Sequence, residues 1–277
     1  MGAGLQTARQ DVAVHLGTEL LDVRLTEMDD AEVEALKLLV AERGVVFLRA
    51  QDMTLDEQVA FGRRMGELLP NPAASPGVEG HPDVFHVRND ATSTFSERGA
   101  VWHTDQSFWA RPPAFSMLRV ETLPPVGGDT LFTSMYGVYD SLSPRLQDFL
   151  LTLTARHDGA ARFRARLGVD GPLADLSFVH PVVRSHPMTG RKLLWVNAAY
   201  TDRLLELEEG ESDALLRFLF DKVANAVAYQ VRFRWERNSV ALWDNRCVQH
   251  SVCWDYHPET REGFRVMTVG EQPYLEA

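Results

Sequence analysis

The chain contains 277 residues, of which 45% are hydrophobic and 24% charged, and its formal net charge is −11. This composition is typical of a globular protein with enough apolar side chains for a sizeable core. The negative charge argues against nucleic acid and anionic membrane surfaces as partners, because both are bound by basic faces. No stretch approaches the roughly 18 apolar residues of a membrane span. We therefore expect neither nucleic acid nor a membrane as a partner.

The N-terminus and the cysteine content both bear on the cellular compartment. The first residues, Met1 to Gln6, contain neither the basic region nor the apolar run of a signal peptide. There are two cysteines, Cys247 and Cys253, which is too few for a disulfide framework and fits a reducing compartment. We expect a cytoplasmic protein.

The first 65 residues alternate between strand and helix patterns. We expect a strand-like entry at 11–25, an amphipathic helix at 27–43 and a buried strand at 44–49. Thr54 and Glu57 then form a capping box, because Thr54 can cap the helix while Glu57 reaches back to it. This opening predicts packing elements and no chemistry.

Residues 66–100 are rich in proline, glycine, asparagine and serine, which interrupt regular structure. A loop of this length in a compact domain is often a lid or a binding loop, and otherwise a surface excursion. His81 and Asp83 fall inside it without strand context. We expect a lid-like loop at about 66–100 and place no chemistry on these two residues.

The remainder of the chain is predicted to consist mainly of short strands. Strands are expected at 114–120, 130–133, 178–184, 192–196, 228–235, 239–244 and 264–269. Helices are expected at 138–153, with an interruption near Ser143 and Pro144, and at 211–226. The regular strand–helix alternation of a doubly wound parallel sheet is missing, as is any repeat of 20–50 residues. We expect a mainly β protein with flanking helices, whose core is a double-stranded β-helix of jelly-roll or cupin-like type, in a single domain over 1–277.

The stretch Val101–Phe108 contains the first candidate metal ligands. If it is a strand, His103 and Asp105 point to the same side. One further histidine would complete a 2-His-1-carboxylate site, which leaves three positions open on the metal. The pattern alone is weak, because similar triplets begin at His81 and His257. A solvated or salt-bridged pair is the commoner explanation of such a triplet.

The candidates that would complete this site lie elsewhere in the chain. His250 is the best third ligand, with a packed core histidine as the alternative. Arg261 and Arg265 are four residues apart, so a strand would place both on one face. Two guanidinium groups facing a cavity require an anion, although they could also balance nearby surface acids. Thr130 could add a hydroxyl donor to the same anion.

Five blocks of sequence together resemble the TauD/TfdA family of Fe(II)- and 2-oxoglutarate-dependent dioxygenases in order and spacing, from about Gly17 to Pro273. The blocks are Trp102–Asp105, Gly127–Thr130, His180–Arg184, Trp243–His250 and Arg261–Arg265. The resemblance implies a double-stranded β-helix fold. It also implies an enzyme that uses O2 to oxidise, most simply to hydroxylate, an aliphatic C–H bond with release of succinate and CO2.

The same resemblance implies roles for individual residues. His103, Asp105 and His250 would hold Fe(II). Thr130 and Arg261 would bind the distal carboxylate of 2-oxoglutarate. Arg265 would lie beside the metal, near the other carboxylate of the cosubstrate and the anionic group of the substrate.

The substrate-binding positions depart from the taurine-specific members of the family. An ungapped alignment from Gly66 puts Asn71 where they carry a sulfonate-binding histidine. Just before the Trp102–Asp105 block, Gly99 stands where they carry an amide-bearing residue. Gln106 is polar where an apolar side chain is expected, and Tyr200 takes the place of the pocket aromatic. We expect Asn71, Gln106, Tyr200 and Arg265 to bind a small anionic substrate other than taurine.

Two alternatives remain open at this point. The same cofactor chemistry could end in desaturation or rearrangement, as in a biosynthetic pathway. The chain could also be a non-catalytic jelly-roll binding protein, although the intact triad and arginines argue against it. The family implies a homo-oligomer, a dimer or a tetramer.

Overall fold

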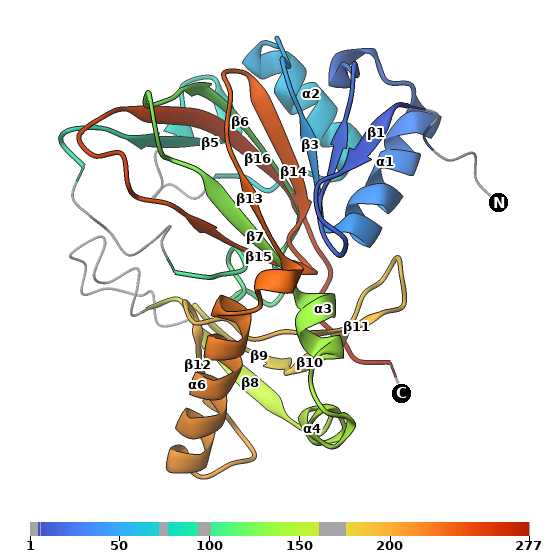
Figure 1. Ribbon diagram of the computed structural model, residues 1–277, viewed down its shortest axis with the longest axis vertical. Helices are drawn as coiled ribbons and strands as arrows, with labels where there is room; N and C mark the ends of the chain where they lie inside the picture. Colours follow the sequence, from blue (N-terminus) through green and yellow to red (C-terminus); the bar gives the residue numbers. More distant parts are fainter. Residues whose placement is uncertain (1–4, 6, 72–76, 94–100, 161–175, 277) are drawn as a thin grey trace.

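One eight-stranded sheet forms the upper part of the molecule in Figure 1 and contributes residues to both main apolar clusters. The computed structural model describes residues 5, 7–71, 77–93, 101–160 and 176–276. In spatial order the strands of the large sheet are β1 (Arg9–Asp11), β2 (Thr18–Leu20), β3 (Val45–Leu48), β14 (Ser239–Asp244), β6 (Pro113–Thr122), β16 (Arg261–Val269), β5 (His81–Asn89) and β4 (Gly77–Val78).

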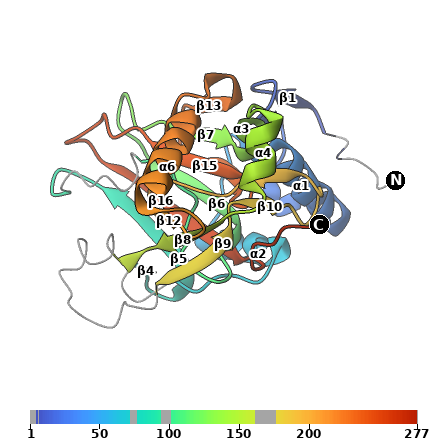
Figure 2. The same cartoon turned by 90° about the horizontal axis from the view of Figure 1, so that it is seen from below.

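Three smaller sheets complete the β structure. The one that matters most for the site has the order β13 (Gln230–Phe233), β7 (Thr130–Ser134), β15 (Val248–Val252). The others are β12 (Thr201–Leu204), β8 (Thr154–Asp158), β9 (Ser177–Pro181), and the hairpin β10 (Val183–Ser185), β11 (Lys192–Leu194). Figure 1 shows the β13–β7–β15 sheet beside the large sheet, with β8, β9 and β12 below them, and Figure 2 gives the view from that lower end.

Helices cover the outside of both layers. They are η1 (Leu25–Glu27), α1 (Asp30–Arg43), α2 (Leu55–Met65), α3 (Met135–Asp140), α4 (Pro144–Leu150), α6 (Glu209–Ala224) and η3 (Val227–Tyr229). Helices α1 and α2 pack on the large sheet, whereas α3, α4 and α6 lie with the smaller sheets (Figure 1). The predicted capping box is confirmed, because the Thr54 hydroxyl accepts from the Glu57 amide and Glu57 accepts from the Thr54 amide.

The central strand β14 shows why the core has two halves. Every residue of β14 is buried, as expected of a strand covered on both faces. Its side chains alternate, so Val240 and Leu242 join the apolar cluster under α1 and α2, whereas Trp243 joins the cluster between the sheets. In the second cluster Phe47 stacks on Phe233 with ring centres 4.0 Å apart. The space between the sheets is therefore filled with aromatic side chains up to the edge of the site.

The expected jelly-roll core is confirmed, and most predicted strands and helices form close to their expected bounds. Two expectations were wrong. Residues 101–108 form no strand; a single backbone bridge at His103 is followed by a turn, in which Gln106 adopts a φ of 49°. The segment 66–100 is interrupted by strand β5, which pairs with β16. This strand was not predicted because Gly80 and Pro82 indicate a break just before its apolar residues.

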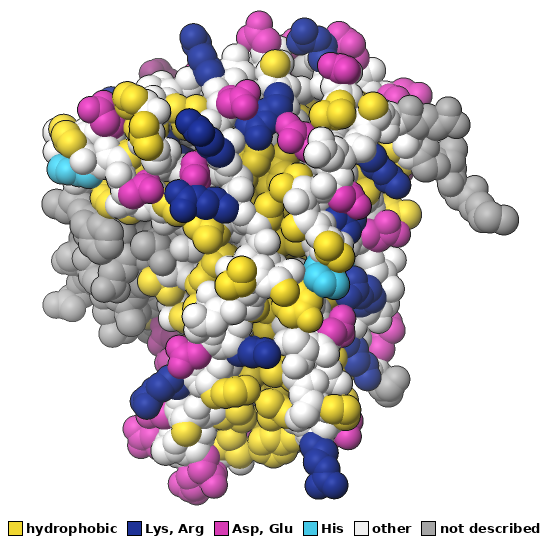
Figure 3. Space-filling view, in the orientation of Figure 1, with side chains coloured by type: hydrophobic (Ala, Val, Ile, Leu, Met, Phe, Trp, Pro, Cys, Tyr) yellow, Lys and Arg dark blue, Asp and Glu magenta, His cyan; other side chains and the backbone are white. Residues whose placement is uncertain are grey.

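Some expectations fall outside the described residues. They are Gly99 and those parts of the lid-like loop that lie at 72–76 and 94–100. Within the described part of the chain, no helix is both long enough and apolar enough to cross a membrane. On the face shown in Figure 3, basic and acidic side chains are interspersed over the surface.

Candidate active site

Two histidines from distant parts of the chain are joined by a backbone bridge. The amide of His103 donates to the carbonyl of His250 at 3.2 Å, and the amide of His250 donates to the carbonyl of His103 at 3.0 Å. The two imidazole rings are 4.2 Å apart between centres. Strand β15 alternates, so His250 turns to the Trp243 side of its sheet, whereas its neighbour Gln249 turns away.

Asp105 completes a cluster of three possible metal ligands. Its two carboxylate oxygens lie 3.9 Å from Nε2 of His103 and 3.9 Å from Nε2 of His250. All three side chains are buried, and their ligand atoms lie within 4.8 Å of one another. The Nδ1 nitrogen of His103 lies 2.8 Å from the carbonyl of Val101, to which it donates, so its Nε2 lone pair faces the cluster.

The charges in this cluster suit a metal ion. Burial alone would raise the pKa of Asp105, but Arg265 and the two imidazoles outweigh it, so the pKa lies below its usual value. Burial and the neighbouring His103 lower the pKa of His250 to about 3. At neutral pH the cluster therefore offers an ionised carboxylate and a neutral imidazole, which are the protonation states that bind metals.

Asn245 fixes the backbone of Asp105, a role that was not predicted from the sequence. Its side-chain oxygen accepts from the Asp105 amide at 2.9 Å, and its nitrogen donates to the Asp105 carbonyl at 3.1 Å. The same nitrogen donates to the carbonyl of Pro113 in β6. Asn245 is fully buried, so these bonds do not compete with water. It lies within the Trp243–His250 block, which was the only signal available.

The turn that follows Asp105 is held from its other side by buried polar groups. The Ser107 hydroxyl lies 2.9 Å from Nδ1 of His157 and accepts from the Asn197 amide at 2.8 Å. Nε2 of His180 lies 3.0 Å from the carbonyls of both Ser107 and Trp109. Burial lowers the pKa of His180 to about 4, so it holds the turn as a neutral group.

Arg265 reaches the cluster from strand β16. Its Nη1 donates to both oxygens of Asp105 at 3.0 Å. Each carboxylate oxygen can accept from more than one direction, so this contact leaves room for a metal on the histidine side. Nε of Arg265 is buried and has no partner among the described residues. Arg265 thus contacts Asp105, one of the three candidate ligands.

Arg261 and Thr130 both contact Trp235, and each keeps a polar group that could bind an anion. Arg261 is 1% exposed, and it donates from Nε to the carbonyl of Gly128 at 3.0 Å. Its Nη2 is buried without a partner in the described part of the chain. The indole of Trp235 donates to the Thr130 hydroxyl at 3.0 Å, which leaves the hydroxyl hydrogen of Thr130 for another acceptor. Gly128, with a φ of 75°, lets Arg261 pass closely, since a Cβ there would lie 3.1 Å from its Cδ.

A second group of potential metal ligands reads better as a structural network. Nδ1 of His186 lies within 3.3 Å of two backbone amides and accepts from them, so its Nε2 carries the proton and donates to Asp244 at 3.1 Å. Arg246 donates to both oxygens of the same carboxylate. Cys247, the third member, has a pKa raised well above its usual value by burial. A metal would have to displace several charge-assisted bonds here.

The predicted substrate residues differ in where they lie. Tyr200 stands edge-on to His103 with ring centres 6.4 Å apart, so it belongs to the surroundings of the cluster. Gln106 follows Asp105 directly, and its Oε1 is buried with no partner among the described residues. Asn71 donates from its amide to the carbonyl of Val84 at 3.3 Å, which ties it to strand β5.

The two competing triplets lie apart from this cluster. Nδ1 of His81 lies 3.8 Å from the exposed carboxylate of Asp56, and Asp83 lies 3.4 Å from Arg63. His257 is exposed. Both triplets therefore match the commoner explanation, a solvated or salt-bridged pair.

A jelly roll with a buried His–Asp–His cluster beside two arginines defines the class of non-haem metal oxygenases with a 2-His-1-carboxylate site. Comparison with known proteins gives the particular family: residues 8–267 match the family described as "Taurine catabolism dioxygenase TauD, TfdA family". The chain belongs to this family and is a 2-oxoglutarate-dependent non-haem iron dioxygenase.

Three relatives illustrate the similarity. The chain is 37% identical to an α-ketoglutarate-dependent sulfonate dioxygenase of Saccharomyces cerevisiae, over 93% of this chain and 66% of that protein. It is 31% identical to an α-ketoglutarate-dependent sulfate ester dioxygenase of Pseudomonas putida, over 95% of this chain and 89% of that protein. The crystal structure of a taurine dioxygenase from Burkholderia xenovorans superposes with a TM-score of 0.83 at 33% identity, over 96% and 90% of the two chains.

Proposed function

We propose that His103, Asp105 and His250 hold Fe(II), and that the enzyme uses it with 2-oxoglutarate and O2 to oxidise an aliphatic C–H bond of a small anionic substrate. The observation that carries this proposal is the convergence of the three ligand atoms within 4.8 Å. Iron bound there supplies the oxidation itself, with release of succinate and CO2. The protein's part is to bind, orient and exclude water.

Arg261 and Thr130 bind the distal carboxylate of 2-oxoglutarate. A buried guanidinium with an unpartnered Nη2 is costly unless an anion meets it. The hydroxyl of Thr130, already accepting from Trp235, donates to the same carboxylate. These two donors orient the cosubstrate, because a planar guanidinium and a hydroxyl grip a carboxylate from fixed directions.

Arg265 binds anionic groups beside the metal, both the second carboxylate of the cosubstrate and the charged group of the substrate. The relatives named for sulfonates and sulfate esters support an alkyl sulfonate or sulfate ester as that substrate. Gln106 and Tyr200 line its position, and Asn71 stays a prediction from the alignment. Taurine is not the expected substrate, because these positions differ from those of the taurine-specific members.

Three further expectations belong to the same proposal. The chain forms a single domain. It assembles as a dimer or a tetramer. It works in the cytoplasm.

The test is a screen for succinate release with probes of one shape and different charge. Hexanesulfonate and hexyl sulfate are expected to stimulate release from the Fe(II)-loaded protein, whereas hexylamine is not. Product mass separates the outcomes, since hydroxylation adds one oxygen and desaturation removes two hydrogens. If anaerobic Fe(II) and 2-oxoglutarate together give no charge-transfer absorption, the cofactor assignment fails, and a non-catalytic binding protein becomes the better reading.

A further inference from the structure

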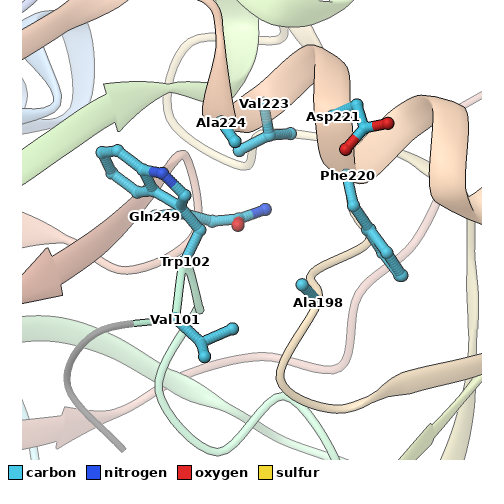
Figure 4. A pocket seen from close by; sticks show the side chains of 8 residues that line it. All are labelled: Val101, Trp102, Ala198, Phe220, Asp221, Val223, Ala224 and Gln249. Carbon is cyan, nitrogen blue, oxygen red and sulfur yellow. The ribbon is translucent and has the colours of Figure 1, made fainter. Parts of the chain in front are cut away.

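A cavity of about 270 Å³ lies on the other side of the backbone bridge that joins the two histidines. Its walls come from the residues just before His103, from helix α6, from Ala198 and from Gln249 (Figure 4). The residues that line it are Val101, Trp102, Ala198, Phe220, Asp221, Val223, Ala224 and Gln249. Trp102 and Gln249 directly precede the two histidines, so one stretch of backbone separates this cavity from the metal cluster.

The polar lining of this cavity contains two acceptors, the Gln249 amide oxygen and the Asp221 carboxylate, besides the indole N–H of Trp102. Gln249 is 1% exposed, and its Nε2 donates to the carbonyl of Val196 at 2.6 Å. That bond fixes the amide orientation, so Oε1 is the other atom, and it is buried with no partner among the described residues. Figure 4 shows the amide of Gln249 projecting toward the middle of the cavity, with the carboxylate of Asp221 on the helix above. An occupant must therefore bring hydrogen-bond donors.

The size and the walls limit what the occupant is. An apolar cavity of about 150 Å³ can hold benzene, so this one accommodates a single ring with a short side chain. Trp102, Phe220 and Val223 supply apolar and aromatic surface for such a body. The exposed carboxylate of Asp221 favours a positive charge on the donor group.

We propose that this cavity is a second ligand site, which binds a small apolar molecule carrying a primary ammonium group. The ammonium donates to Oε1 of Gln249 and faces Asp221, while the ring or branched chain packs between Trp102 and α6. Asp221 disfavours anions, so an anionic substrate of the metal site would not compete. The inference does not depend on the identity of the metal or of the oxidised substrate.

The experiment compares three probes of one shape: 2-phenylethylamine, which is protonated at pH 7.5, 2-phenylethanol and phenylacetate. The full chain is labelled with [15N]tryptophan and loaded with Zn(II) and 2-oxoglutarate, and each probe is titrated while the indole N–H signals are recorded. The Trp102→Phe variant identifies the signal of Trp102. The amine should shift that signal with a Kd on the order of 1 mM, the alcohol should bind about tenfold more weakly, and the acid should not bind.

Two substitutions on the helix test the charge. Asp221→Asn should lower the affinity for the amine to about that for the alcohol. Asp213 is exposed on the same helix and lies outside the cavity, so Asp213→Asn should leave both affinities unchanged. Ala224→Leu, which narrows the cavity from an exposed position, should weaken all binding. The proposal is overturned if the Trp102 signal does not move with the amine up to 20 mM. It is also overturned if the amine and the alcohol bind equally in the unchanged protein, or if Asp213→Asn acts as strongly as Asp221→Asn.

Discussion

The two sides of the His103–His250 bridge are built for opposite charges. On one side two arginines meet the candidate metal cluster, and the unpartnered polar atoms there include the donors Nη2 of Arg261 and Nε of Arg265, next to the acceptor Oε1 of Gln106. On the other side an apolar cavity presents the unpartnered acceptor Oε1 of Gln249 beside a carboxylate. Alternation along a strand is enough to produce this difference, because neighbouring residues of one strand face different compartments.

The largest effect is expected from a substitution that removes one of the three candidate metal ligands. His103→Ala should abolish Fe(II) binding and succinate release, because the two remaining protein ligands hold the metal too weakly. Anaerobic titration with Fe(II) and 2-oxoglutarate measures the loss as the missing charge-transfer absorption. His257→Ala, which alters an exposed histidine of a similar triplet, is the matched control and should behave as the unchanged protein. Equal loss in both variants would contradict the assignment.

The next largest effect concerns Arg261. Arg261→Met should raise the KM for 2-oxoglutarate by about 100-fold or more, because a charge-assisted bidentate contact is worth roughly 3 kcal/mol. Arg261→Lys should recover only part of this, since a lysine cannot grip a carboxylate with two parallel bonds. Steady-state kinetics with varied 2-oxoglutarate provide the measurement. An unchanged KM in Arg261→Met would place the cosubstrate elsewhere.

Asn245 sits where the bridge and the carboxylate ligand meet, and its effect should be intermediate. Asn245→Ala should weaken metal binding by about 10- to 100-fold, which is the usual range for groups that orient metal ligands. The control is Gln51→Ala, which also removes a buried amide that bonds to three backbone groups, far from the cluster. Co(II) titration followed by absorption measures affinity, and urea unfolding measures stability. Both variants should lose stability, but only Asn245→Ala should lose metal affinity.

The smallest expected effect is on the pH dependence of stability, and it tests the role of His180, which holds the turn after Asp105. Burial keeps the pKa of His180 at about 4, below the ordinary value of about 6.5. The unfolded chain therefore binds more protons between these pH values, so stability is complete above pH 6.5 and falls as the pH drops toward 4. His180 should contribute a loss of about 2 kcal/mol by pH 5.

Urea unfolding of the metal-free protein between pH 7.5 and pH 5 measures this loss. In His180→Gln, which keeps a donor for the two carbonyls of the turn, the decline with pH should be shallower. The same decline in both proteins would show that His180 is not kept neutral by its surroundings.

More of the candidate site than of the surrounding fold could be predicted from the sequence. The candidate ligands and the two arginines were predictable because five blocks in register resemble one family, and because Arg261 and Arg265 keep an even spacing on β16. Strand β5 was missed because Pro82 stands at its start, where a local pattern indicates a break. The turn after Asp105 was missed because its backbone is set by Asn245, His157 and His180, and contacts of this kind are invisible until distant segments meet.

The cavity behind the bridge could not have been predicted for a related reason. It needs the outward side of β15 and one side of α6 to be brought together, and neither segment carries a motif of its own. Val223 and Phe220 on α6 indicate ordinary core packing when they are taken alone. Only the placement of Gln249 against them turns this packing into a pocket with a polar end (Figure 4).

Because the bridge between His103 and His250 forms only in the folded chain, binding of a metal at this cluster would be coupled to folding. Asp105 and Asn245, which clamp its two sides together, are 140 residues apart in the chain. A metal that needs all of these segments in place binds the folded chain and not the unfolded one. At a hundred times its Kd it would raise the free energy of unfolding by about 2.7 kcal/mol. Supply of iron would then set how long the protein lasts as well as how fast it works.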